Sequence, residues 1–77
     1  MEPGSYEIKK VIAEVGTHGN YSKLLTLTSW SGGTPKIDLR AWRILNGAPV
    51  MPGKGITLTE AEAQTASEAI FSFLRGN

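Results

Sequence analysis

The residues best suited to chemistry lie in segment 36–42, Lys-Ile-Asp-Leu-Arg-Ala-Trp. Side chains alternate between two faces of an extended strand, so the polar members of this segment share one face and the aliphatic members share the other. A face that carries cations and a large aromatic ring suits a polyanion with flat rings, such as a single-stranded nucleic acid. The residues expected on that face are Lys36, Asp38, Arg40 and Trp42.

A second strand of similar character is expected over residues 23–30, where threonines alternate with leucines and the run ends at Trp30. The following Ser-Gly-Gly-Thr, residues 31–34, predicts a hairpin turn because glycine adopts positive φ readily. Such a hairpin would place Trp30, Lys36 and Arg40 on one surface. There the cations would hold phosphates, and an exposed ring would stack a base with about 1–3 kcal/mol per base.

Two residues of segment 36–42 have a second interpretation. Trp42 would be a core residue if a bulge flipped the strand register, since tryptophan is usually largely buried. Asp38 suits a phosphate-binding face poorly. We expect it to orient Arg40 or Lys54, or to accept a hydrogen bond from the backbone or from another subunit.

The charge of the chain is small in total but uneven along it. The 77 residues carry a net charge of +1, yet residues 16–58 hold five cations and a single carboxylate. Residues 59–77 hold three glutamates and one arginine. This distribution fits a molecule with one side that faces an anion, although chance clustering in so short a chain is the alternative. The central cations are Lys23, Lys36, Arg40, Arg43 and Lys54.

Length and composition predict one small domain that spans residues 1–77, with a flexible start over residues 1–5. A chain this short buries little surface, and without cysteine it forms no disulfide. Further stability must therefore come from close packing or from oligomerisation. No apolar stretch is long enough to span a membrane, and no signal-peptide pattern is present. We therefore expect a cytoplasmic location and no membrane partner.

The sequence contains few residues in arrangements suited to catalysis. The only histidine, His18, precedes a glycine in an expected turn, and no cluster of histidines or cysteines could hold a metal. Asp38 has no carboxylate near it in sequence for acid–base catalysis. Lys54 lies between glycines but lacks the spacing of a phosphate-binding loop. We expect no enzyme activity, no metal or other cofactor, and no small-molecule substrate.

The chain as a whole predicts four strands followed by one helix, an α+β fold with a curved antiparallel sheet. Strands are expected at 6–15, 23–30, 36–42 and 54–58, with a turn at 16–22 and a proline-containing loop at 43–52. Thr59 and Glu62 have the spacing of a capping box. They predict a helix that begins after Thr59 and runs to about Arg75, where Gly76 stops it.

One stripe of this helix is apolar, at the width usual for a face packed on a core. Phe71 lies outside the stripe, and we expect it to contact a second subunit because so small a domain gains stability by association. The stripe consists of Ala63, Ala66, Ala69, Ile70, Phe73 and Leu74. The expected dimer interface comprises Ile70, Phe71, Phe73 and Leu74.

Segments 36–42 and 53–59 together resemble the family of the transcriptional coactivator positive cofactor four, in particular its short bacterial YdbC-like branch. The second segment reads Gly-Lys-Gly-Ile-Thr-Leu-Thr, follows a proline-containing loop and leads into an acidic helix start. The resemblance extends from about Lys23 to Leu74. It implies a β-β-β-β-α fold that dimerises through its helices and sheet edges. It also implies binding of single-stranded DNA, largely without sequence preference, along two curved sheets.

The resemblance further implies roles for individual residues. Arg40 matches the family's strand arginine and Lys54 its lysine before the Gly-Ile strand, and both positions contact DNA in the family. Trp30 falls about one residue from the family's hairpin aromatic, and Trp42 matches an aromatic position. Eukaryotic members carry a lysine-rich hairpin and a serine-rich tail. Residues 31–34 of this chain replace most of that hairpin charge, so weaker binding is expected.

The sequence therefore predicts a homodimer that binds single-stranded DNA, with RNA as the other candidate ligand, and that acts in transcription, replication or repair. A bacterial source would place it with the nucleoid, and a eukaryotic source would place it in the nucleus. The rival hypothesis is a small protein–protein interaction module with incidental nucleic-acid affinity, which the near-neutral net charge favours. The expected nucleic-acid contacts are Lys23, Trp30, Lys36, Arg40, Trp42, Arg43 and Lys54.

Overall fold

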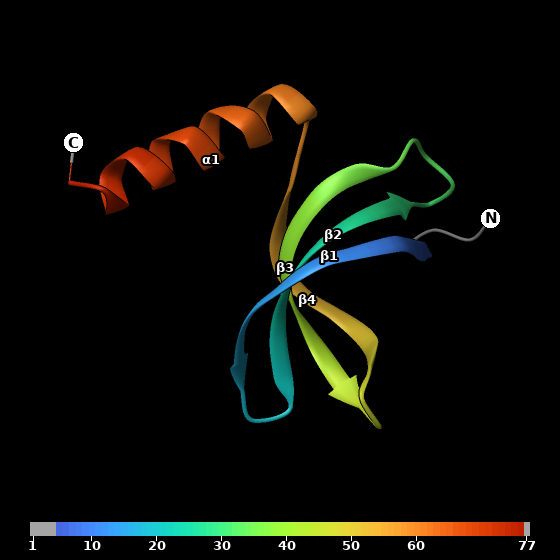
Figure 1. The fold of residues 1–77 in the computed structure, drawn as a ribbon. Helices are drawn as coiled ribbons and strands as arrows, with labels where there is room; N and C mark the ends of the chain where they lie inside the picture. Colours follow the sequence, from blue (N-terminus) through green and yellow to red (C-terminus); the bar gives the residue numbers. More distant parts are fainter. Residues whose placement is uncertain (1–4, 77) are drawn as a thin grey trace.

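The computed structural model describes residues 5–76, which form four strands and one helix (Figure 1). The strands lie side by side in chain order as one antiparallel, strongly curved sheet. This architecture confirms the predicted α+β fold. Most of the expected flexible start, residues 1–4, lies outside the described residues. The elements are β1 (Tyr6–His18), β2 (Tyr21–Trp30), β3 (Lys36–Leu45), β4 (Ala48–Leu58) and α1 (Glu60–Leu74).

The predicted loop at 43–52 is wrong. β3 continues to Leu45, β4 begins at Ala48, and only Asn46 and Gly47 lie between them. These two residues have φ values of 53° and 77°, as the central positions of a two-residue type I′ hairpin require. The prolines within β4 are tolerated because β4 is an edge strand of the sheet, where some N–H groups have no strand partner to lose.

One face of the curved sheet is polar and buried. Thr26, Asp38 and Trp42 on this face each have 0% exposure. Thr26 stands directly opposite Asp38 across β2 and β3. The hydroxyl oxygens of Thr26 and Thr28 are 2.7 Å apart, so these buried groups hydrogen-bond each other. We call this the inner face; its β2 and β3 residues are Ser22, Leu24, Thr26, Thr28, Lys36, Asp38, Arg40 and Trp42.

The opposite, outer face carries aliphatic side chains and remains partly uncovered. Leu39 stands opposite Leu25 on one side and Ile56 on the other. Ile56, at one end of this row, is 57% exposed. The sheet thus curls around a polar and aromatic interior and turns its aliphatic face outward. The aliphatic residues of the outer face are Leu25, Leu27, Ile37, Leu39, Ile56 and Leu58.

The curvature has a physical cause in β1. Its pairing with β2 shifts register at three places, and each β-bulge of this kind bends the strand and increases its twist. The bend carries Tyr6 over the inner face, where its ring centroid lies 5.1 Å from that of Trp42. The shifts lie between Ile8 and Lys10, between Val11 and Ala13, and between Glu14 and Gly16.

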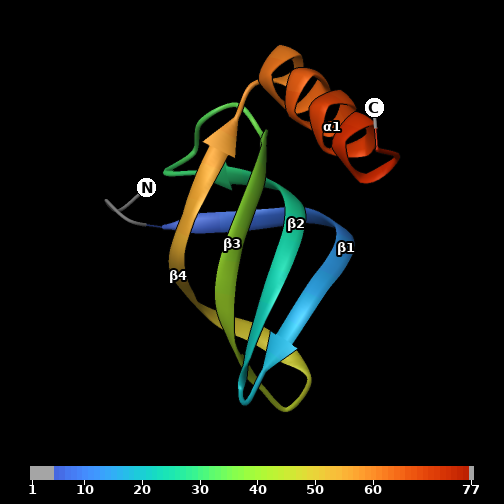
Figure 2. The ribbon, with the colours of Figure 1, turned by 90° about the vertical axis from the view of Figure 1, so that its left-hand side faces the viewer.

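The helix α1 begins as predicted and projects away from the sheet (Figures 1 and 2). The amide of Glu62 donates to the hydroxyl of Thr59 at 3.1 Å, and the amide of Thr59 donates to the Glu62 carboxylate at 2.9 Å. This reciprocal pair is the predicted capping box. At the other end Arg75 is the C-cap residue and Gly76 has a φ of 82°. No helix within residues 5–76 is long and apolar enough to cross a membrane.

The expectation that the apolar stripe of α1 packs on the core of its own chain is wrong. None of the described helix residues is buried. Phe73 is 78% exposed and Leu74 is 74% exposed. Because the helix leaves the sheet at the end of β4, its far half has no sheet surface to cover. The apolar side of α1 is therefore open over the far half of the helix, whereas Ala63 and Ala66 near its start are half-buried.

Candidate functional site

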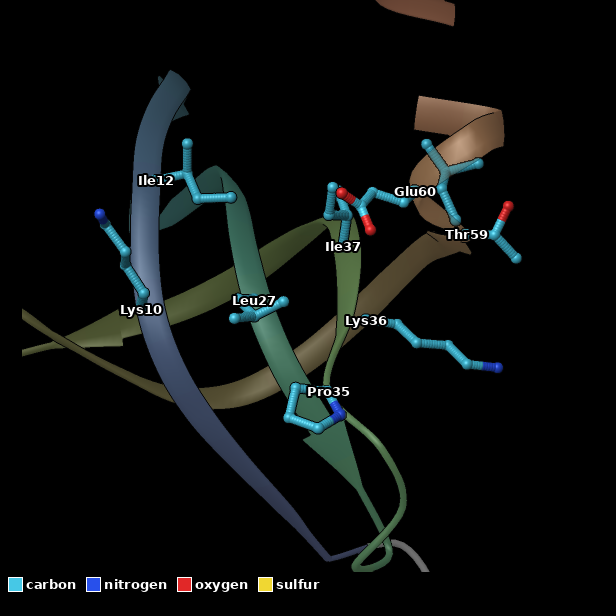
Figure 3. Close-up of a pocket in the computed structure, with 9 residues that line it drawn as sticks. Lys10, Ile12, Leu27, Pro35, Lys36, Ile37, Thr59 and Glu60 are labelled. Atoms are coloured by element: carbon cyan, nitrogen blue, oxygen red, sulfur yellow. The ribbon is translucent and has the colours of Figure 1, made fainter. Parts of the chain in front are cut away.

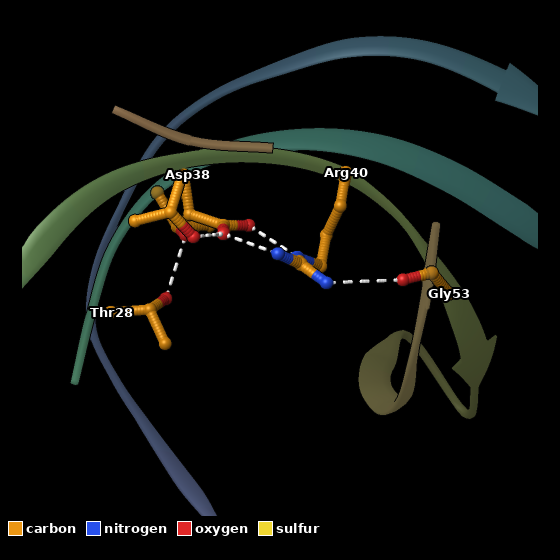
Figure 4. Close-up of polar contacts among 6 residues, drawn as sticks. Thr28, Asp38, Arg40 and Gly53 are labelled. Carbon is orange, nitrogen blue, oxygen red and sulfur yellow. Dashed lines mark hydrogen bonds and ion pairs between the residues drawn. The ribbon is translucent and has the colours of Figure 1, made fainter. Parts of the chain in front are cut away.

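Arg40 is held in a fixed orientation on the inner face (Figure 4). Its Nε and Nη2 donate to the two carboxylate oxygens of Asp38, at 2.6 and 2.7 Å. Its Nη1 donates to the carbonyl oxygen of Gly53 at 3.2 Å. Thr57 adds a further hydrogen bond to Asp38 at 2.9 Å. Two parallel hydrogen bonds between guanidinium and carboxylate fix both groups, so the expected role of Asp38 in orienting Arg40 is confirmed.

Trp30 packs on the guanidinium of Arg40. The Cζ atom of Arg40 lies 4.5 Å from the centroid of the Trp30 ring, within the range of a cation–π contact. The ring of Trp30 is also stacked with that of Trp42, with centroids 6.2 Å apart and an interplanar angle of 15°. Tyr6 closes the cluster, 5.8 Å from Trp30. The predicted neighbourhood of Trp30 and Arg40 is therefore confirmed.

Trp42 is not accessible to a ligand in this structure. Its side chain is 0% exposed and is covered by Tyr6 and Trp30. The core interpretation of Trp42 is correct, and the expectation that Trp42 contacts nucleic acid is wrong. No flip of register is needed for this burial, because the face that Trp42 shares with Arg40 is itself the interior of the curved sheet. Trp30 is only half-buried and remains a candidate.

An open cavity of about 460 Å³ adjoins Trp30. The exposed Lys36 lies at this cavity and forms no ion pair with any residue in the range 5–76. Thr34 and Thr57 also line this cavity. A half-buried ring, a free cation and neutral hydrogen-bonding groups therefore lie together, which is the combination that stacks a base and holds its phosphate.

A second cavity, of about 470 Å³, opens on the outer face at the start of α1 (Figure 3). Its surface includes the aliphatic side chains of Leu27, Ile37 and Leu58, and its charged residues are Lys10, Lys36 and Glu60. Lys36 also lines the cavity at Trp30. It is as large as the cavity at Trp30 but contains no aromatic ring. An apolar side chain from another protein segment suits this surface better than a nucleotide does.

The predicted cations do not share one face of the sheet. Lys36 and Arg40 belong to the inner face. Lys23 and Arg43 occupy the alternate positions of β2 and β3, and both are exposed. Lys54 has the strand parity of Ile56 and Leu58 on β4, which places it outward as well. The expectation of one continuous anion-facing side is therefore wrong.

Tyr21 is an exposed aromatic residue outside the set of predicted contacts. The sequence predicts a turn over 16–22, but the turn contains only Gly19 and Asn20, and β2 begins at Tyr21. Tyr21 is 43% exposed and stands directly opposite Arg43. The missed signal is the alternation of strand residues 23–30, which extends back through Ser22 to Tyr21.

The chain is similar to a protein of Treponema pallidum (strain Nichols) that is named only as an uncharacterized protein. The two are 40% identical over 58 residues, which is 74% of this chain. The chain spans 65% of the length of that relative. No family model matches the chain. The name of this relative describes no function.

Proposed function

We propose that this protein is a homodimer that binds single-stranded DNA largely without sequence preference, with RNA as the other candidate ligand, in transcription, replication or repair. One observation carries the proposal: Trp30 packs on an immobilised Arg40 beside the free cation Lys36, at an open cavity. Bases in a single strand have free flat faces, whereas bases inside a duplex are stacked on each other. An aromatic ring next to a cation therefore favours single strands.

The two inner-face cations contribute in different ways. Asp38 offsets the charge of Arg40, and three of the roughly five N–H donors of the guanidinium are already used. Arg40 therefore offers a fixed plane and its remaining donors rather than a net positive charge. Lys36 has no such partner among the described residues, and it supplies the charge that holds a phosphate.

The open apolar side of α1 supports the homodimer. An isolated helix of about 12–15 residues is marginal in water, and α1 has 15 residues with none of its described side chains buried. Large apolar groups on this helix include Ile70 at 59% exposure and Phe71 at 61% exposure. A second copy would supply the same surface in a two-fold arrangement, so that each helix buries the other.

Fluorescence titration tests the binding function. A dT oligonucleotide is titrated into the full chain at about 50 mM and 200 mM salt while tryptophan emission is followed. We expect quenching of emission and weaker binding at the higher salt. Lys36→Gln should weaken binding severalfold, because one phosphate contact and its released counterion are lost. Lys9→Gln is the matched control, since Lys9 already pairs with Glu7 at 3.0 Å on β1.

Arg40 needs a more careful variant than alanine. Removal of the guanidinium would leave Asp38 as an unpaired buried charge, and the chain would lose stability as well as the ligand contact. Trp30→Phe keeps an aromatic ring over Arg40 and should reduce affinity without loss of the fold. Absence of any quenching or shift at about 50 mM salt would refute nucleic-acid binding.

A protein-interaction module remains the second candidate function. The apolar cavity at Leu27, Ile37 and Leu58 favours it, because this surface is open and belongs to the face of the sheet opposite to that of Trp30. In that case the chain would hold an apolar segment of another protein and would bind the dT oligonucleotide weakly or not at all. The titration above separates the two functions directly.

A further inference from the structure

Burial leaves few aromatic rings on the sheet for contact with a ligand. Trp42 is fully buried and Trp30 is half-buried under Arg40 and Tyr6. Tyr21, by contrast, has 43% of its surface exposed. It lies at the first position of β2, on the outer side of the sheet. Among the described sheet residues, Tyr21 is therefore the aromatic ring most open to solvent.

Strand register places Tyr21 among cations. Tyr21 stands directly opposite Arg43, and Lys23, opposite Ala41, lies diagonally next to Arg43. Side chains directly opposite each other in an antiparallel pair have Cβ atoms about 4.5–5.5 Å apart, so these groups lie within contact range. Lys54 lies on the far side of Ala41, where β4 has its register shift. We call this group the tip surface: Tyr21, Lys23, Arg43 and Lys54.

The cations of the tip surface keep their full charge. None of Lys23, Arg43 and Lys54 forms an ion pair with any part of the chain between residues 5 and 76. The sheet partners of this region are also uncharged or basic. Lys23 faces Gly16 on β1, and Arg43 faces Met51 on β4. This differs from the inner face, where Asp38 offsets the charge of Arg40.

The location of the tip surface leaves it free in a dimer formed through α1. The β1–β2 turn next to Tyr21 lies at the end of the sheet opposite the helix (Figure 2). The backbone holds this end in place, since the amide of Ile44 donates to the carbonyl oxygen of Asn20 at 2.8 Å. The tip surface is thus an ordered, charged and aromatic surface that self-association through the helix does not cover.

We infer that the tip surface is a second contact region for single-stranded nucleic acid, in which Tyr21 stacks a base while Lys23, Arg43 and Lys54 hold phosphates. This inference rests on the proposed function, and it adds Tyr21 as a binding residue. It assigns most of the salt dependence of binding to the tip surface, because its three cations are unpaired. The slope of log K against log salt is negative, and each lost phosphate contact makes it shallower by about 0.7 for a single strand.

Affinity measurements on paired variants test the inference. Fluorescence anisotropy of a labelled dT oligonucleotide is recorded over a salt series for the wild type, Tyr21→Leu, Tyr21→Phe and Arg43→Gln. We expect Tyr21→Leu to weaken binding by between about 5-fold and 100-fold, and Tyr21→Phe to retain most of it. Arg43→Gln should make the slope of log K against log salt shallower by about 0.7, whereas the control Lys9→Gln should leave that slope unchanged.

Photocross-linking gives a readout that does not depend on any variant. An oligonucleotide that contains bromodeoxyuridine is irradiated with the wild-type chain, and the cross-linked peptide is identified by mass spectrometry. Cross-links at Tyr21 support the inference. Wild-type affinity in both Tyr21→Leu and Arg43→Gln, together with weakened binding in Lys36→Gln, would overturn the tip surface and leave the proposed function intact. If the wild type bound polyglutamate as tightly as the dT oligonucleotide, the tip surface would be a general polyanion surface, and its assignment to nucleic acid would be overturned.

Failure of the proposed function has a different signature. If the wild type shows no binding to the dT oligonucleotide at about 50 mM salt, both the inner-face site and the tip surface are refuted together. Circular dichroism of each variant confirms that its sheet and helix are retained before affinities are compared.

Discussion

Asp38 and Arg40 form a bidentate ion pair on the inner face of the sheet, with the carboxylate side chain 0% exposed and the guanidinium side chain 17% exposed. The two residues are separated by one position on β3, so their side chains lie on the same face of one strand. Thr57 and Gly53 of β4 complete their hydrogen bonds. The pair therefore links β3 to β4 and also presents the plane on which Trp30 packs.

Breaking this pair should cost much of the stability of the chain. In Arg40→Ala the Asp38 carboxylate stays buried without its counter-ion, and loss of one partner of a buried pair typically costs about 3–5 kcal/mol. Urea denaturation at one fixed protein concentration measures the free energy of unfolding. The exposed pair of Lys9 and Glu7 is the control, and Lys9→Gln should cost less than about 1 kcal/mol. Equal losses in the two variants would contradict the structural role of Asp38.

Gly55 should tolerate no side chain. A Cβ atom at this position would lie 2.5 Å from the carbonyl oxygen of Leu39 and 2.6 Å from the Cα atom of Arg40, both of which belong to the backbone. Gly55→Ala therefore forces β3 and β4 apart, and we expect a loss of more than about 1–3 kcal/mol in thermal or urea unfolding. Gly16→Ala is the matched control, because a Cβ atom there meets nothing within 4 Å. If Gly55→Ala unfolded at the same midpoint as the wild type, β3 and β4 would have to separate at little cost, and the prediction would be wrong.

The capping box of α1 should contribute measurably to helix content. Thr59→Ala removes the hydroxyl that accepts from the Glu62 amide, and such a substitution typically costs about 1 kcal/mol. Far-ultraviolet circular dichroism during thermal unfolding measures the change. Thr65→Ala provides the comparison, because Thr65 lies in the exposed middle of the helix, where alanine is the better helix former. A helix signal that falls equally in both variants would exclude a specific capping effect.

The open side of α1 should control self-association. Phe73 is 78% exposed in the single chain, so Phe73→Glu leaves the sheet untouched but places a charge in the expected helix–helix contact. Sedimentation velocity should show a dimer for the wild type and a monomer for this variant, with a loss of helix signal because the single helix is marginal alone. Ser72→Glu, at an exposed position on the side of the helix opposite Ile70 and Leu74, should remain dimeric. A stable wild-type monomer would refute the dimer.

Local sequence patterns predicted the local structure well. Alternation over 23–30 and 36–42 identified two strands, and the Thr59–Glu62 spacing identified the helix start. These features depend on neighbours within a few residues, which is the range over which the pattern is informative. The hairpin at Asn46 and Gly47 was also encoded locally. It was missed because nearby prolines argue against a strand, and the sequence does not reveal that β4 lies at an edge.

The functional surface was only partly predictable for a related reason. Sequence alternation assigns Arg40 and Trp42 to one face but does not say whether that face is the inside or the outside of the sheet. The bulges of β1 decide this, because they bend the sheet and bring Tyr6 over Trp42. Trp42 is buried as a result, while Tyr21 remains in solvent.

By itself, then, the sequence determined the order and type of the elements, the capped start of the helix, and the shared face of Asp38 and Arg40. Only the tertiary structure decided which face is enclosed and which cations remain unpaired. It also decided that α1 projects away from the sheet, so that most of its apolar side does not pack on its own chain. The physical reason is range: strand alternation and helix capping are set by residues close in sequence. Curvature and burial depend on strand pairings across the whole sheet.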